Sequence, residues 1–457
     1  MTLGSGMAAL DTSVVTIALP TIGRDLASSL GGLQWVNNGL TLSLSTLILV
    51  GGSLGDRLGR RRVYLVGISW FAVASLLCAL APSTGWLVAA RVLQGIGAAL
   101  LTPGALAIIR STLREDDQPG AIGVWAGMSG IAVAIGPFLG GWIIEHLTWR
   151  WIFLVNLPLS AAVVAAGLAV IPESRDDRAV GRFDLAGAGL TAAMLAALTW
   201  LLTESRTMSS ALLAVAGAVA AVGMVVFIVV ERRVAYPLVP LTLFRSRVFS
   251  SANLMTFLVY GALGATLFFL VVQLQVTAGF SVRDSGLTTL PITILLLFLS
   301  APMATLAQRI GPRAPMTVGP MVVALGVLIL SRVQATSGWG IALLGTSVFG
   351  LGLSVLVSPL TAAVLGAAPE RLAGAASALN NAVARTGSLL ATAALPAVVG
   401  LSGADYLDPV RFTHGYRLAM YVTAGLLGLG GLVSWFGLRG TAPAARARAG
   451  EPGPTGP

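Results

Sequence analysis

Apolar stretches of about twenty residues recur along the whole chain and are separated by short polar connections. A membrane-spanning helix needs ~20 mostly apolar residues. Stretches of this kind are centred near residues 13, 44, 72, 97, 132, 161, 195, 219, 261, 296, 323, 350, 386 and 427. The longest polar connections, Glu173 to Asp184, Glu231 to Arg247 and Ser402 to Arg417, are too short to fold as a soluble domain. The pattern predicts an all-α polytopic membrane protein with fourteen transmembrane helices.

Composition supports this class and excludes several others. Of the 457 residues, 56% are hydrophobic and only 10% are charged, whereas about a quarter of an ordinary soluble domain is charged. Soluble enzymes, disordered proteins and secreted disulfide scaffolds are therefore excluded. The single cysteine, Cys78, permits neither an internal disulfide nor a cysteine metal cluster, and His146 and His414 are too far apart in sequence to suggest a metal site. The opening residues lack a charged leader and are expected to begin the first span.

The basic charge of the chain agrees with a membrane topology. The net charge is +10 and every basic residue is an arginine. If the N-terminus is cytoplasmic, nineteen of the 28 arginines fall in inner connections, seven in outer ones, and Arg91 and Arg385 inside spans. Cytoplasmic loops of membrane proteins carry an excess of Lys and Arg. We therefore expect a multi-pass protein of the cytoplasmic (inner) membrane with both termini cytoplasmic, and no nucleic-acid partner.

Two loops of the chain are similar to each other. Gly52–Arg61, after the second span, aligns without a gap with Ala304–Arg313, after the tenth, and the two share one Leu, two Arg and one Gly. Chance similarity between two loops rich in Arg and Gly is the alternative. Internal repeats divide many transporters into two similar bundles. We therefore predict a six-helix bundle at residues 1–172, an inserted two-helix hairpin at 185–231, a second six-helix bundle at 248–438 and a disordered cytoplasmic tail at 439–457.

Three further segments, together with residues 52–61, match motifs of one transporter family. Residues 10–20 read LDTSVVTIALP, and residues 87–99 of the fourth span include Arg91 and Gln94. The fifth span carries Gly123, Ala132, Gly136, Pro137, Gly140 and Gly141. With these motifs in order, the chain resembles the major facilitator superfamily, and specifically its fourteen-span drug:proton antiporter branch. It departs from the usual motifs at Ser13, Thr16 and Ala132.

The resemblance implies a function as well as a fold. It implies a proton-coupled antiporter with the major-facilitator fold that exports amphipathic small molecules, such as drugs, antibiotics or a natural product, by alternating access. Such a transporter is not an enzyme and needs no cofactor, because the proton-motive force drives it. Its expected partners are protons, a small amphipathic substrate and membrane lipid, and it is expected to be a monomer. An uptake symporter or a lipid or metabolite carrier on the same fold is the alternative. An intramembrane enzyme would need a second catalytic group near Asp11 within the spans, and none is found there.

Asp11 and Arg91 are the candidates for proton coupling. Asp11 is the carboxylate placed well inside a span, and intramembrane charges are functional candidates by default. Arg91 cannot lose its proton and must find acceptors. The resemblance implies a role for this arginine in proton transfer. The alternatives are a permanent structural ion pair, or a position of Asp11 near the membrane boundary, and a packing role for Arg91.

Two motifs are candidates for the moving parts. The loop of Asp56, Arg57, Gly59, Arg60 and Arg61 is expected to gate the transporter through carboxylate–arginine pairs, or to serve only as a topology signal. Small residues four apart allow helices to pack closely. The fifth-span residues are therefore expected to lie at the moving interface between the bundles, or to reflect ordinary packing. These residues are Gly136, Pro137, Gly140 and Gly141.

A third set of residues is expected to line the substrate cavity. The cavity candidates are Gln94, Trp125, Asn253, Tyr260, Asn380, Asn381 and Arg385, with Trp35, Asn38, Phe257 and Gln273 as further possibilities. Arg385 follows Asn381 by four residues and is the second arginine inside a span, with a structural role as the alternative. With Asp11, Arg91 and Arg385, the embedded charge is net +1, which favours neutral or anionic amphiphiles.

Overall fold

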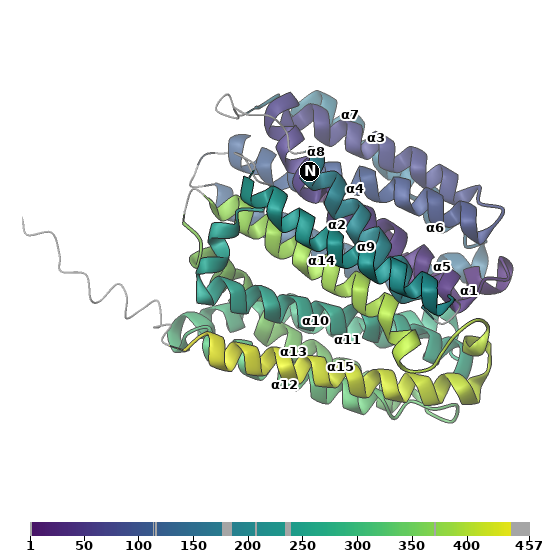
Figure 1. Ribbon diagram of the computed structural model, residues 1–457. Coiled ribbons are helices and arrows are strands. Elements are labelled where there is room, and N and C mark those ends of the chain that lie inside the picture. The colour runs from purple at the N-terminus through teal and green to yellow at the C-terminus, as the bar shows by residue number, and fades with distance from the viewer. Residues whose placement is uncertain are drawn as a thin grey trace, which may run out of the picture.

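The computed structural model describes residues 2–112, 114, 117–175, 185–205, 208–233, 239–369 and 372–439. In this part of the chain all regular secondary structure is helical, and the long helices run side by side along one common direction (Figure 1). The helices are α1 (Thr2–Asp25), α2 (Leu30–Leu58), α3 (Arg60–Ala79), α4 (Thr84–Thr112), α5 (Gln118–His146), α6 (Trp151–Leu154), α7 (Asn156–Val170), α8 (Leu185–Glu204), α9 (Ser210–Arg233), α10 (Arg247–Val272), α11 (Val282–Ile310), α12 (Arg313–Leu330), α13 (Trp339–Gly366), α14 (Ala373–Val398) and α15 (Pro409–Gly437).

The predicted apolar stretches are helices. Each of the fourteen predicted centres falls inside one of them, with the centre at 161 in α7. Among the described residues, eleven helices are long and apolar enough to cross a membrane by length and composition. The prediction of an all-helical, multi-pass protein is confirmed.

The long helices form two groups that pack mainly within themselves. In the first, α1 packs on α5, α2 and α3 both pack on α4, and α3 also contacts α7. In the second, α10 packs on α14 and α15, and α13 packs on α11 and α12. The groups meet where α5 contacts α11 and where α2 contacts α14. The remaining helices, α8 and α9, pack together, and α8 lies against both α2 and α14, so α8 bridges one side of that seam.

The two similar loops end their helices in the same way. Gly59 follows α2 with a φ of 109°, and Gly311 follows α11 with a φ of 86°. Each donates its backbone N–H to the carbonyl four residues earlier, that of Gly55 at 3.1 Å and that of Ala307 at 2.8 Å. Positive φ angles favour glycine because it has no Cβ. The shared glycine of the repeat therefore has one conformational role in both loops.

Candidate functional site

A buried ion pair joins α1 to α4. Arg91 Nη1 donates to Asp11 Oδ2 at 2.5 Å, and the two side chains are 1% and 0% exposed. A buried charge without a partner is costly, so each of these groups needs the other. The same Arg91 nitrogen also donates to Gln94 Oε1 at 2.6 Å, and Arg91 Nε donates to the carbonyl of Val36 at 3.2 Å.

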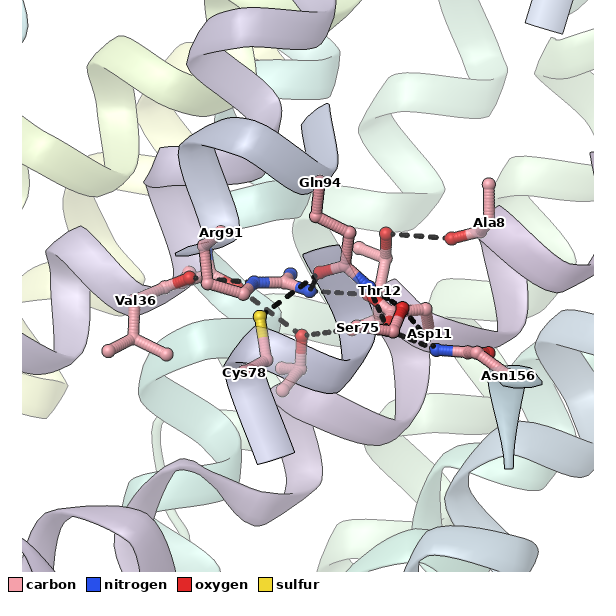
Figure 2. Close-up of polar contacts among 11 residues, drawn as sticks. Ala8, Asp11, Thr12, Val36, Ser75, Cys78, Arg91, Gln94 and Asn156 are labelled. Atoms are coloured by element: carbon pink, nitrogen blue, oxygen red, sulfur yellow. Dashed lines mark hydrogen bonds and ion pairs between the residues drawn. The ribbon is translucent and has the colours of Figure 1, made fainter. Parts of the chain in front are cut away.

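Amide side chains complete the surroundings of the carboxylate. Figure 2 shows Asp11 between Arg91, Gln94 and Asn156. Gln94 Nε2 and Asn156 Nδ2 each donate to Asp11 Oδ1 at 2.9 Å, and Gln94 also donates to Ser75 Oγ at 2.8 Å. Asn156, Gln94 and Ser75 are 0% exposed. The carboxylate therefore receives hydrogen bonds on both oxygens in a polar cluster formed by α1, α3, α4 and α7.

One atom of this cluster has no partner within the described residues. Asn156 Oδ1 is buried and accepts no hydrogen bond there, although the Nδ2 atom of the same amide donates to Asp11. A buried polar atom without a partner is costly and calls for an explanation. A rotated Asn156 amide would present this oxygen to a protonated Asp11 as an acceptor.

A central cavity lies on the other side of α1. It has a volume of about 450 Å³ and is lined by residues of both helix groups. On α1 the lining residues include Ala8, Thr12, Ser13 and Thr16, whereas the Asp11 side chain points into the polar cluster within the first group (Figure 2). Asp11 is thus separated from the cavity by the thickness of α1.

Only part of the expected cavity set lines this cavity. Asn381 and Arg385 of α14 do, and Pro137 of the fifth-span glycine motif lines it as well. Arg385 Nε donates to Asn381 Oδ1 at 2.9 Å, which is the contact expected of residues four apart on one helix.

The other candidates lie elsewhere. Gln94 belongs to the Asp11 cluster. Asn380 Nδ2 donates to Asn253 Oδ1 at 3.1 Å, which ties α14 to α10. Tyr260, on α10, is half-buried and is not among the lining residues of the cavity. The side chain of Trp125 lies outside the described part of the structure.

The candidate gating loop is held within the first helix group. Asp56 pairs with Arg60 on the next turn, Nη2 to Oδ1, at 2.8 Å. Glu173, beyond α7, accepts the backbone N–H groups of Arg61 at 3.1 Å and Arg62 at 3.2 Å. Its carboxylate therefore caps the N-terminus of α3, where negative charge is favourable.

Two further contacts fasten the same loop. Arg61 Nη2 donates to the carbonyl of Leu168 at 2.8 Å. A Cβ added at Gly59 would lie 2.7 Å from the carboxyl carbon of Glu173, so the glycine also makes room for this cap. Arg57 has an interaction partner as well.

The glycine motif of α5 lies between the two helix groups. Gly136 and Gly140 face α1, because added Cβ atoms would lie 2.8 Å from side-chain atoms of Ser13 and Val14. Gly141 faces α11, with an added Cβ 2.5 Å from Arg283 Cα. The backbone of Pro137 in turn meets Gly286 of α11 closely. Small residues thus allow α5 to contact one helix of each group.

Hydrogen bonds between the two groups gather at the end of the molecule where α1 finishes, here called the far end. Gln34 Nε2 donates to the carbonyls of Thr392 at 2.6 Å and Ala393 at 3.0 Å. Tyr406 donates its hydroxyl to the carbonyl of Ser28 at 2.9 Å. The remaining contacts of this set are Asn38 to Leu389, Leu30 to Gly403 and Gln275 to Ile17. The far end is therefore closed.

Several of these residues were not among the sequence-based candidates. Ser75 and Asn156 lie in apolar spans, and a polar side chain in such a position is a signal that could have identified them. Glu173 and Gln34 lie near helix ends, where polar residues are common, so their partners are visible only in the structure.

Comparison with known proteins places the chain in a family. The family model for the Major Facilitator Superfamily matches residues 1–392. The tetracenomycin C resistance and export protein of Streptomyces glaucescens is 35% identical over 396 residues, which cover 86% of this chain and 73% of that protein. The multidrug resistance protein Stp of Mycobacterium tuberculosis is 36% identical over 89% of this chain and 76% of its own. A methylenomycin A resistance protein of Bacillus subtilis is 32% identical over 93% and 92%.

Solved structures agree on the fold. A bacterial homologue of the human lysosomal transporter Spinster, in an inward-facing and unoccupied conformation, superimposes with a TM-score of 0.67 at 15% identity over 96% of this chain and 95% of its own. A POT family transporter gives a TM-score of 0.70 at 12% identity over 94% of each chain. Taken with the sequence relatives, these matches show that the chain is a multi-pass membrane transporter, not an enzyme, and belongs to the Major Facilitator Superfamily.

Proposed function

We propose that this transporter exports amphipathic small molecules across the cytoplasmic membrane in exchange for protons. The observation that carries the proposal is the central cavity, which is lined by both helix groups and closed at the far end. Sequence relatives named for drug and antibiotic resistance support export as the direction. By this likeness, tetracenomycin C and methylenomycin A are candidate substrates.

The proposed topology follows the helix order. All fourteen long segments cross the membrane, with α6 and α7 forming one span and both termini cytoplasmic. Residues 1–172 and 248–438 form the two six-helix bundles, residues 185–231 the inserted hairpin, and residues 439–457 a cytoplasmic tail, of which 440–457 lie outside the described residues. In this orientation the far end faces the outside, and the cavity receives its substrate from the cytoplasm.

Asp11 and Arg91 are the proposed proton-coupling pair. In the arrangement seen here the carboxylate holds Arg91, Gln94 and Asn156 together. Protonation removes the charge that binds Arg91, and the Asn156 oxygen becomes the acceptor of the new O–H group. Because α1 carries Asp11 on one face and cavity residues on the other, a rearrangement of the pair moves the wall of the cavity.

Alternating access would then exchange the closed ends. The bonds of Gln34 and Tyr406 open, and the loop at Asp56 and Arg61 closes against the second bundle. A membrane potential of 100 mV supplies ~2.3 kcal/mol per charge, and a tenfold concentration ratio costs ~1.4 kcal/mol. One proton per cycle therefore supports roughly fifty-fold accumulation.

Everted membrane vesicles with an acidic lumen test the proposal. Tetracenomycin C and methylenomycin A are added separately while a fluorescent dye reports the pH gradient. An antiporter dissipates the gradient as the compound accumulates inside, and vesicles that contain Asp11→Asn show neither change. Compound that leaves preloaded vesicles together with protons would instead identify an uptake symporter.

A further inference from the structure

Among the described residues that line the cavity, one side chain is charged. Arg385, on α14, is half-buried at the cavity wall. The rest of the lining is apolar or bears neutral groups, and the neutral polar side chains are Thr12, Ser13, Thr16, Thr102, Thr289, Thr293 and Asn381. The cavity thus combines an apolar surface with a single cationic group.

None of the described residues that line the cavity is an acid that could neutralise that cation. Asp11, the embedded acid of α1, is buried, points away from the cavity and already pairs with Arg91. The helices that line the cavity contain four other acids, and each lies near a helix end: Asp25, Asp56, Glu145 and Asp284. The embedded charges of Asp11 and Arg91 therefore cancel, and the positive charge of Arg385 remains at the cavity.

The guanidinium of Arg385 has N–H donors beyond the one that its hydrogen bond to Asn381 uses. Its Nε atom donates to Asn381 Oδ1 at 2.9 Å, and this is the hydrogen bond that the structure gives to Arg385 among the described residues. A guanidinium has five N–H donors in a planar fork that matches a carboxylate with two parallel bonds. Asn381 thus fixes the plane of the group and leaves its terminal nitrogens available.

We infer that Arg385 recognises an acidic group of the substrate, so that the preferred substrates are amphipathic organic anions, with an aromatic or alicyclic body and one carboxylate or comparable acid. This inference rests on the proposed function, since it names the substrate class of the same cavity. The apolar wall accommodates the body of the molecule, and the threonine hydroxyls bind its further polar groups. Asn381 is a positioning residue that acts through Arg385.

Matched probe pairs test the charge preference directly. The pairs are naphthalene-2-, anthracene-2- and anthraquinone-2-carboxylic acid, each with its neutral carboxamide. Binding to the purified full-length transporter in lipid nanodiscs is measured by isothermal titration calorimetry at pH 7.5, where the acids are ionised. We expect at least one acid to bind about tenfold or more tightly than its amide, as a charge-assisted bidentate contact implies.

Substitutions assign that preference to one residue. Arg385→Gln should abolish the preference for the acid and leave amide binding unchanged, while Arg385→Lys should retain part of it. Asn381→Asp should also abolish the preference for the acid although Arg385 is still present. This substitution places a carboxylate at the position that accepts the hydrogen bond from Arg385 Nε. Arg332→Gln, which removes a positive charge from an exposed loop, should behave like the unmodified protein. Thermal melting of each variant reports whether it is folded.

The outcomes separate this inference from the proposed function. Equal binding of acid and amide by the unmodified protein, no binding of any probe, or a preserved preference in folded Arg385→Gln would each overturn the role of Arg385. If Arg385→Gln does not fold, the Asn381→Asp variant decides. Loss of the preference for the acid in this variant would support the role of Arg385, and a retained preference would contradict it. If acids bind through Arg385 but do not accumulate in everted vesicles, the result would contradict the antiport proposal and would leave the recognition site at Arg385 supported.

Discussion

Arg91 Nη1 lies 2.5 Å from Asp11 Oδ2, and the pair is buried on the side of α1 that faces away from the central cavity. A cavity carboxylate would be free to bind a cationic substrate. Asp11 instead binds three side chains of its own bundle, Arg91, Gln94 and Asn156. This arrangement separates the group proposed to take up the proton from the group proposed to bind the substrate.

Removal of one partner of the pair should be more harmful than removal of both. Asp11→Asn leaves Arg91 as a buried charge without a counter-ion, and loss of one partner of a buried pair costs about 3–5 kcal/mol. We expect a clear fall in the melting temperature of Asp11→Asn and partial recovery in Asp11→Asn with Arg91→Gln. Neither variant should couple export to protons. Coupled export by the stable double variant would show that the pair is structural only.

Close packing of α5 on α11 should depend on Gly141. An added Cβ there would lie 2.5 Å from the backbone of Arg283, so Gly141→Ala must push the two helices apart. Overpacking of this kind costs about 1–3 kcal/mol. We expect Gly141→Ala to lower the export rate several-fold at normal protein levels. Gly189→Ala on α8 is the control, because no atom lies within 4 Å of its added Cβ; equal effects of the two substitutions would contradict the packing argument.

The closed far end should open when Gln34 is shortened. The Gln34 amide donates to two carbonyls of α14, and each hydrogen bond contributes about 0.5–1.5 kcal/mol. Gln34→Ala should therefore shift the balance toward the state open at the far end by roughly five- to a hundredfold. The readout is labelling of Thr16→Cys in the cavity, in a Cys78→Ala background, by an impermeant maleimide added outside.

A glutamine in an exposed loop is the control for this shift. Gln334 lies between α12 and α13 and is exposed. Gln334→Ala should leave the labelling rate unchanged. If labelling of Thr16→Cys is no faster in Gln34→Ala than in Gln334→Ala, Gln34 does not hold the far end closed.

The cap on α3 should depend on the charge of Glu173. Its carboxylate accepts two backbone N–H groups at the start of the helix, and loss of such a cap costs about 0.5–2 kcal/mol. Glu173→Ala should lower the melting temperature, with a smaller effect for Glu173→Gln, which retains an acceptor. Hydrogen exchange at Arg61 and Arg62 should increase in Glu173→Ala; unchanged exchange there would show that the cap does not protect the helix end.

Much of the architecture could be predicted from local pattern. Long apolar runs predict helices because only a helix satisfies its own backbone groups in lipid, and each predicted stretch is a helix here. Contacts within one helix could also be predicted from the spacing of residues, such as the contact of Arg385 with Asn381 four residues earlier. The positive φ shared by Gly59 and Gly311 likewise follows the repeat in the sequence.

Contacts between helices could not be predicted in the same way. Hydrophobic periodicity is weak in helices that are apolar on every side, so it does not show which face meets which neighbour. The sequence by itself therefore determined that Asp11, Arg91 and Arg385 lie in apolar helices, and that they are the short list of embedded charges. Only the tertiary structure decided that Asp11 and Arg91 neutralise each other, while Arg385 is the charged residue among the described cavity lining, because helix rotation and register set which side chains meet.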